Sequence, residues 1–224
     1  MKKRVLVLCG GVSAERRVSL VSAKTVFDAL DAKRYDKSLI YIDPKGRWLK
    51  GDPKKLPSKV PQRELAVGAG KPLEPFALLG GARAPDAVFP VLHGPFGEDG
   101  TMQGFLELAG APYVGCGVLA SSAGMDKDAS KKLSAQAGLP IIPYGTLNDP
   151  ELAAQLAERL GYPVFVKPAR MGSSVGVGKA RSASELAAAV REAFKYDDKI
   201  LIEKGIPARE IETAVLGDPW SLSP

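Results

Sequence analysis

The stretch Val-Leu-Val-Leu-Cys-Gly-Gly at residues 5–11 decides the fold class of this chain. Its first part is a short, uniformly apolar run, which is typical of a buried parallel strand, and the glycines end it. A helix is expected to begin near residues 13–16, and residues 18–30 carry the apolar spacing of a helix. A strand that passes directly into a helix is the opening unit of an α/β fold.

The same alternation continues through the first half of the chain. Residues 50–75 are rich in lysine, proline and glycine and lack periodicity, so we expect a surface excursion there. The order of the other elements predicts an open parallel sheet with flanking helices. We expect these elements to be strands at 38–42, 87–92 and 113–115, a turn at 43–46 and a helix at 102–109.

The second half follows a different plan, which indicates an α+β module. A glycine-rich turn at 172–176 separates two of its strands. Because the pattern changes, we place a domain boundary near residue 122, which divides domain 1–122 from domain 123–224. The apolar spacing of this half predicts helices at 127–137, 151–160 and 183–194, and strands at 164–167, 177–180, 200–203 and 210–216.

Composition and charge narrow the classes of function. The formal net charge is +6, but the basic residues are scattered and are not interleaved with aromatic residues. A solvated surface or an anionic small substrate is therefore favoured, and we expect no nucleic acid. The chain has no apolar run of transmembrane length and no signal peptide pattern. We therefore expect no membrane partner and a cytoplasmic location, where Cys9 and Cys116 would be buried, reduced thiols.

The first motif with chemical potential is Gly-Gly-Val-Ser-Ala-Glu-Arg at residues 10–16. It joins the end of a strand to the start of a helix, where backbone amides can bind an anion. Ligands of open α/β sheets also gather at this end of the strands. The motif lacks the dinucleotide pattern G-x-G-x-x-G, so NAD is not favoured. Taken alone, a plain tight turn explains it equally well.

The second motif is Leu-His-Gly-Pro-Phe-Gly-Glu-Asp-Gly at residues 92–100, which follows another strand end. His93 is the only histidine of the chain and lies among glycines, where the backbone can approach a ligand closely. A metal site would need partner ligands at suitable spacing. Substrate orientation by His93 is therefore favoured over metal binding and over a buried structural histidine.

The third motif places Lys167 at a strand end, shortly before the Gly-Ser-Ser-Val-Gly turn at 172–176. A lysine can meet a phosphate as a point charge, and the free amides and hydroxyls of the turn suit a flap over phosphates. Downstream, Glu203 could accept a hydrogen bond from an adenine amino group, and Glu210 could bind ribose hydroxyls. A glycine hairpin with charged surface residues is the alternative interpretation.

Together these motifs resemble the D-alanine–D-alanine ligases of the ATP-grasp superfamily. The resemblance implies a pre-ATP-grasp N-terminal domain followed by an ATP-grasp module, and it extends to about Gly217. Each matching segment is short, but their joint order is very specific. The segments are Gly-Gly-Val-Ser-Ala-Glu at 10–15, Leu-His-Gly at 92–94, Gly-Glu-Asp-Gly-Thr at 97–101, Gln-Gly-Phe-Leu-Glu at 103–107, Met-Asp-Lys at 125–127, Val-Lys-Pro at 166–168, Gly-Ser-Ser-Val-Gly at 172–176 and Ile-Glu-Lys at 202–204.

The resemblance implies a role for each matching residue. Glu15 and Ser173 would be catalytic, because Glu15 would bind the ammonium group of the first D-alanine and Ser173 would hydrogen-bond with Glu15 and order the site. Val18, His93 and Gly94 would complete the substrate site. The ATP-binding residues would be Lys127 and Lys167 at the phosphates, Gly172, Ser173, Ser174 and Val175 over them, Glu203, Lys204 and Ile206 around adenine, and Glu210 at the ribose.

The implied reaction uses ATP and Mg²⁺ (or Mn²⁺) to join two D-alanines through an acyl phosphate, for peptidoglycan precursors. In the family a further C-terminal segment supplies a mobile loop, an arginine and the magnesium ligands, which include a Glu-x-Asn pair. The only asparagine here is Asn148, in an Asn-Asp-Pro turn. We therefore expect the metal ligands beyond Pro224, with none in this chain, and we expect the chain alone to be inactive or nearly so.

Three alternatives stay open at this point. The chain could be a non-catalytic fragment that binds substrate and nucleotide, or an ATP-grasp ligase for a different acid and amine. The second substrate could be D-alanine, D-lactate or D-serine, because the residues that decide this would lie outside the chain. A homodimer formed through the N-terminal domain is common in the family, but the composition does not test it.

Overall fold

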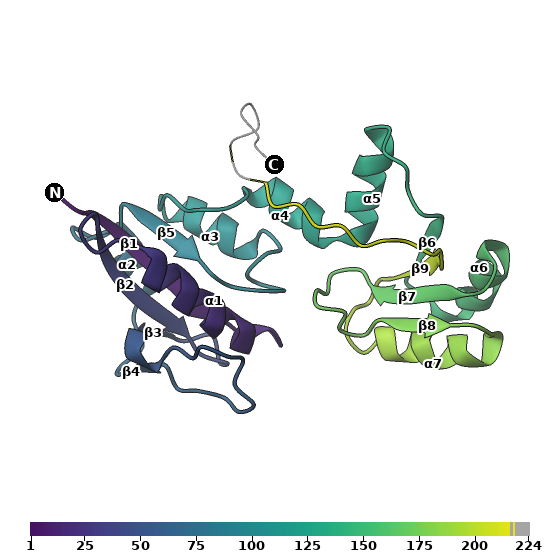
Figure 1. The fold of residues 1–224 in the computed structure, drawn as a ribbon, viewed down its shortest axis with the longest axis horizontal. Helices are drawn as coiled ribbons and strands as arrows, with labels where there is room; N and C mark the ends of the chain where they lie inside the picture. Colours follow the sequence, from purple (N-terminus) through teal and green to yellow (C-terminus); the bar gives the residue numbers. More distant parts are fainter. Residues whose placement is uncertain (216, 218–224) are drawn as a thin grey trace.

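Two β-sheets organise the chain, and Figure 1 shows them in two lobes that are connected through the helices α4 (Val118–Met125) and α5 (Lys127–Gln136). The structure is a computed structural model that describes residues 1–215 and 217. Among these residues, no helix combines the length and the apolar character needed to cross a membrane. The boundary placed near residue 122 falls inside α4 and stays a prediction.

The first lobe has a five-stranded sheet in the order β4-β3-β2-β1-β5. The three strands β2, β1 and β5 are parallel, which confirms the expected α/β core, whereas β3 and β4 add an antiparallel edge. The elements of this lobe are β1 (Lys3–Gly10), α1 (Arg16–Ala29), β2 (Tyr35–Ile42), β3 (Trp48–Gly51), β4 (Gly68–Ala69), α2 (Pro75–Gly80), β5 (Ala87–Pro90) and α3 (Thr101–Leu108), with a 3-10 turn at Pro53–Lys55.

Two expectations for this lobe were wrong. The segment 50–75 is not only a surface excursion, because the end of β3 and all of β4 lie within it and extend the sheet. Strands this short carry too few residues to show a period of two. The expected strand at 113–115 is a single bridge between Tyr113 and Val88. It goes no further because Gly115 leaves the extended region, with φ +127°.

The alternation of side chains along β1 explains the core of the first lobe. Val7 and Cys9 face one side of the sheet, where α1 packs through Leu20. Leu6 and Leu8 face the other side, in the cluster that α2 and α3 cover. A strand that is buried on both faces reads as a continuous apolar run, as residues 5–9 do.

The second lobe has a four-stranded antiparallel sheet in the order β6-β9-β7-β8. Helices α6 and α7 pack on one face and bury the apolar residues of β7 and β9. This arrangement confirms the expected α+β module. Its elements are β6 (Tyr144–Leu147), α6 (Ala153–Leu160), β7 (Val164–Pro168), β8 (Gly178–Ala180), α7 (Ala183–Ala193) and β9 (Ile200–Lys204), with a 3-10 turn at Pro150–Leu152.

The strand expected at 210–216 is the clearest error in this lobe. Residues 210–215 are exposed and form no strand, and residue 216 lies outside the described residues. The partner of β9 on that side of the sheet is β6, for which the sequence predicted no element. In Figure 1 the segment after β9 instead runs back from the second lobe towards α4.

The fold brings three loops towards one region between the lobes. The loops after β1 and β5 both start at the carboxyl ends of parallel strands, where ligands of α/β sheets gather. The loop between β7 and β8 extends from the second lobe towards the start of α1 (Figure 1). Candidate functional residues from both halves of the sequence therefore meet there.

Candidate functional site

Serine hydroxyls fasten the loop after β1 to the loop after β5. The Ser13 hydroxyl donates to the His93 carbonyl at 2.6 Å, and the Ser19 hydroxyl donates to the Val91 carbonyl. Ser19 also accepts from the Gly10 amide at 2.9 Å. Because these bonds join backbone atoms of both loops, residues 10–15 and 92–94 form one shelf.

Glu15 lies on this shelf at the residue before α1 begins. The Ser173 hydroxyl, from the loop between β7 and β8, donates to Oε1 of Glu15, which is the bond expected from the sequence. The other oxygen, Oε2, is buried and accepts no hydrogen bond from any residue that the structure describes. A buried carboxylate oxygen without a donor is unfavourable, so this atom is suited to receive a cationic group such as an ammonium.

Two glycines leave room for the Glu15 carboxylate. A Cβ at Gly94 would clash with Oε2, and Gly94 also has φ +74°, which L side chains rarely adopt. A Cβ at Gly172 would lie 3.2 Å from the same oxygen. Gly94 therefore lies against the Glu15 carboxylate. Val18, the other residue expected at the substrate, is on an exposed part of α1.

His93 is held by two side chains that the sequence analysis did not single out. Its Nε2 lies 2.9 Å from the Ser22 hydroxyl on α1, and its Nδ1 lies 3.5 Å from Glu98. The hydrogen bond with Glu98 raises the pKa of His93, and burial opposes the rise. Glu98 also accepts from the Gly94 amide at 2.7 Å. Glu98 was inside a recognised motif, but spacing alone does not show which way its side chain points.

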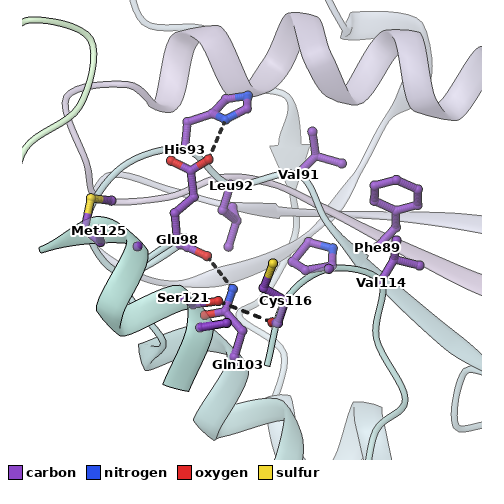
Figure 2. Close-up of a pocket in the computed structure, with 15 residues that line it drawn as sticks. Phe89, Val91, Leu92, His93, Glu98, Gln103, Val114, Cys116, Ser121 and Met125 are labelled. Carbon is purple, nitrogen blue, oxygen red and sulfur yellow. Dashed lines mark hydrogen bonds and ion pairs between the residues drawn. The ribbon is translucent and has the colours of Figure 1, made fainter. Parts of the chain in front are cut away.

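His93 and Glu98 also border a hollow of about 530 Å³ next to the shelf (Figure 2). Its walls come from the end of β5, the loop 114–116, α3 and α4. The side-chain amide of Gln103 donates to the Gly97 carbonyl, while its buried Oε1 accepts nothing from the described residues. Sequence patterns gave no sign of this hollow, because segments far apart in the chain form it.

Cys116 lies at this hollow and is exposed, so the expectation that both thiols are buried was wrong for it. It stands between Gly115 and Gly117 in the exposed loop before α4. Cys9 is fully buried in β1, as expected, and burial raises the pKa of its thiol to about 12. Both cysteines are free thiols.

A second cleft, of about 440 Å³, lies in the second lobe. It brings together every residue expected at ATP except Val175, which follows the cleft residue Ser174 in the same loop. Several of its apolar wall residues were not predicted from the sequence. The cleft is lined by Lys127, Ile142, Phe165, Lys167, Met171, Gly172, Ser173, Ser174, Val177, Glu203, Lys204, Ile206, Ala208 and Glu210.

Lys127 begins α5 and reaches backbone carbonyls at the end of β7. Its ammonium donates to the carbonyls of Pro168 at 3.2 Å and of Met171. Burial, and then the charge of Lys167, lower the pKa of Lys127. A half-buried cation beside a second one favours an anionic ligand, because an anion relieves their mutual repulsion.

Glu203 lies on the cleft side of β9 and is 4% exposed. Its Oε2 accepts from Lys167 at 2.5 Å, and its Oε1 lies 3.1 Å from Lys131 on α5. Burial acts to raise the pKa of Glu203, but these two lysines outweigh it and the pKa is lowered. Lys131 was absent from the sequence analysis, because nothing in its local pattern distinguishes it from Lys132.

The loop between β7 and β8 has an unusual backbone. Ser173 and Ser174 have φ values of 47° and 58°, in the left-handed region that L residues with side chains rarely occupy. Two turn hydrogen bonds stabilise it, from the Val175 amide to Gly172 and from the Val177 amide to Ser174. Such conformations concentrate at functional loops. This loop lines the cleft and also supplies the hydroxyl that binds Glu15.

Comparison with known proteins assigns both halves of the chain. A model described as the D-ala D-ala ligase N-terminus matches residues 4–116, and one described as the D-ala D-ala ligase C-terminus matches residues 133–223. A D-alanine–D-alanine ligase of Heliobacterium modesticaldum is 46% identical over 235 residues, which covers 97% of this chain and 64% of that relative. The corresponding ligase of Mycobacterium tuberculosis is also 46% identical, and the match covers 63% of its length.

Solved structures give the same result. The D-alanine–D-alanine ligase from Coxiella burnetii matches with a TM-score of 0.85 and 38% identity, covering 99% of this chain and 68% of that one. A D-Ala:D-Ser ligase from Enterococcus faecalis matches with a TM-score of 0.76 and 35% identity, covering 92% of this chain and 64% of that one. The chain thus spans about 64% of the length of the curated relatives that it matches.

Proposed function

Because the chain belongs to the D-alanine–D-alanine ligase family, we propose that it contributes the amino-acid shelf and the nucleotide cleft of an ATP-dependent ligase. The ligase would join two D-alanines into the dipeptide used for peptidoglycan precursors. The observation that carries the proposal is the hydrogen bond from Ser173 to Glu15, because it connects the loop over the cleft to the carboxylate on the shelf. A cytoplasmic location and a homodimer stay predictions.

At the shelf, Glu15 would bind the ammonium group of the first D-alanine. In support, Oε1 is fixed by Ser173 while Oε2 is buried and has no donor among the described residues. His93 would help to place the same substrate, because Ser22 and Glu98 fix the orientation of its ring. The Glu98 carboxylate raises the pKa of His93 and so favours its cationic form. Gly94 would leave space for the Glu15 carboxylate.

In the cleft, Lys127 and Lys167 would bind the phosphates of ATP, with the loop 172–175 above them. Two cations at one wall reduce the repulsion that a phosphate meets when an anionic carboxylate approaches it. Glu203 would accept a hydrogen bond from the adenine amino group. Lys204 and Ile206 would line the base pocket, and Glu210 would bind the ribose, since all three residues border the cleft.

The proposed reaction has two steps. A carboxylate oxygen of the first D-alanine attacks the γ-phosphorus, and the bond from this phosphorus to the bridging oxygen breaks to release ADP. The amine of the second D-alanine then attacks the carbonyl of the acyl phosphate, loses a proton and expels inorganic phosphate. Both steps need exclusion of water, because water would hydrolyse the acyl phosphate. The loop that carries Ser173 would provide this cover, since it lines the cleft.

The family implies Mg²⁺ or Mn²⁺, but the donor set found here does not fit such an ion. Among residues 1–215 and 217, no group of three or more His, Cys, Asp and Glu side chains could bind a metal. The cleft carboxylate that contacts Lys167, Glu203, is already paired with Lys167 and Lys131. We therefore assign the metal to no residue that the structure describes and derive no step from it.

The test is phosphate release from ATP, measured with the 224-residue chain and with the chain extended by the C-terminal third of a relative. We expect ATP and D-alanine to bind to both proteins. We expect D-alanine-dependent phosphate release only from the extended one. Turnover by the chain alone would contradict the expected inactivity. If the extended protein accepts D-serine but not D-alanine as second substrate, the proposed product is wrong. A chain that binds neither ligand would refute the proposal itself.

A further inference from the structure

Lys131 pairs with a carboxylate of the cleft but is not itself one of the residues that line it. Its ammonium lies 3.1 Å from Oε1 of Glu203, while Lys167 occupies Oε2. Lys167 and Glu203 line the cleft, whereas Lys131 does not and its side chain is only 19% exposed. Glu203 thus has one cation on the cleft side and one behind it.

The sheet register fixes this arrangement. Glu203 of β9 lies opposite Tyr144 of the neighbouring strand β6 and opposite Phe165 of β7 on the other side. Lys131 lies over the Tyr144 ring at 5.1 Å, and Lys167 lies over the Phe165 ring at 5.8 Å. The two aromatic faces hold the two ammonium groups on opposite sides of one carboxylate. The Tyr144 hydroxyl is itself hydrogen-bonded to Asp128 on α5, which keeps this ring in place.

The position of Lys167 in this pair conflicts with its proposed role at a phosphate. A phosphate bound by Lys167 competes with Oε2 of Glu203 for the same ammonium group. A carboxylate that is 4% exposed cannot be left without a cation, because burial strongly disfavours an unpaired charge. Lys131 removes the conflict, since it remains on Oε1 and keeps Glu203 paired when Lys167 turns to a phosphate.

We propose that Lys131 is a positioning residue that keeps Glu203 paired from behind the cleft and so releases Lys167 to the nucleotide phosphates. The inference rests on the nucleotide cleft proposed above. It differs from a purely structural ion pair, because it assigns the effect of Lys131 to the phosphate part of the ligand and to Lys167. Lys132 provides a matched control, since it is the next residue, is exposed and pairs with Asp128.

The experiment measures displacement of a fluorescent ATP analogue from the 224-residue chain by ATP and by adenosine. For K131M we expect the Kd of ATP to rise about tenfold, as for loss of a hydrogen bond to a charged group. The Kd of adenosine should change less than about twofold, since adenosine does not require Lys167 to leave Glu203. K131R should recover most of the affinity, and K132M should bind ATP like the unsubstituted chain.

A double substitution tests whether Lys131 acts through the charge of Glu203. In an E203Q background, K131M should add little to the change in ATP affinity, because Lys167 no longer has a buried carboxylate to leave. Additive losses, equal losses for ATP and adenosine, or an unchanged Kd in K131M would each overturn the inference. If the unsubstituted chain binds no ATP analogue, the proposed nucleotide cleft is wrong and the inference fails with it. If the unsubstituted chain binds the analogue but the variants behave otherwise than expected, only the inference about Lys131 fails.

Discussion

The hydroxyl of Ser173 donates a hydrogen bond to the carboxylate of Glu15 across 158 positions of sequence. One residue lies on the loop between β7 and β8 of the second lobe, and the other precedes α1 in the first. The bond leaves Oε2 of Glu15 buried and without a donor among the described residues. A loop that covers one candidate site is thereby connected to the central carboxylate of the other.

The first prediction concerns this bond. Ser173→Ala should weaken D-alanine binding about tenfold, because a hydrogen bond to a charged group contributes about 1.5–3 kcal/mol. Glu15→Gln should weaken binding more, since it removes the charge that meets the ammonium. Titration of D-alanine followed by NMR measures both effects. Ser174→Ala is the control, because Ser174 lines the cleft in the same loop; equal losses in S173A and S174A would contradict the assignment.

The second prediction concerns the glycine beside Glu15. Gly94→Ala combines a left-handed φ with a clash against Oε2, whereas Gly110→Ala has a similar φ of +64° and nothing within 4 Å of the added carbon. G110A should lower the free energy of unfolding by about 1–2 kcal/mol from backbone strain alone. G94A should lose about 1–3 kcal/mol more from the clash. Urea unfolding compares the two, and matching losses would show that the clash relaxes freely.

The third prediction uses the single histidine of the chain, which gives one well-separated NMR signal. The hydrogen bond with Glu98 raises the pKa of His93 above 6.5, so Glu98→Gln should lower it. The stability contributed by the His93–Glu98 pair is present below pH 6.5 and is lost as the pH rises through the folded-state pKa. Asp99→Asn is the control, since Asp99 instead accepts from the Phe96 amide. A His93 pKa that is unchanged in E98Q would contradict this origin.

The fourth prediction concerns the buried thiol. Burial raises the pKa of Cys9 from 9.0 to about 12, so the unfolded chain loses this proton at a lower pH than the folded chain. The native state then binds more protons, and stability should fall above pH 9 with a slope of up to about 1.4 kcal/mol per pH unit from this group. Cys9→Ala should remove that part of the slope in urea unfolding between pH 9 and pH 11, and an identical slope would contradict it.

Local patterns in the sequence were sufficient for the framework of the fold. The apolar run at 5–9, the glycines that follow it and the helical spacing after it predicted β1 and α1, and similar patterns predicted β7, α7 and β9. Each of these signals lies within a few consecutive residues, because burial on one or both faces of an element imposes a period on its own sequence. Joint motif order also sufficed to identify the family, which the comparisons confirm.

Only the tertiary structure decided which side chains act on one another. The pairing of Lys131 with Glu203 depends on sheet register and on where α5 packs, and the seating of His93 by Ser22 and Glu98 depends on how two loops meet. No local period encodes such contacts, since their partners are far apart in sequence. For the same reason the exposure of Cys116 was wrongly predicted, because burial depends on what packs over a loop and not on the apolar residues beside it.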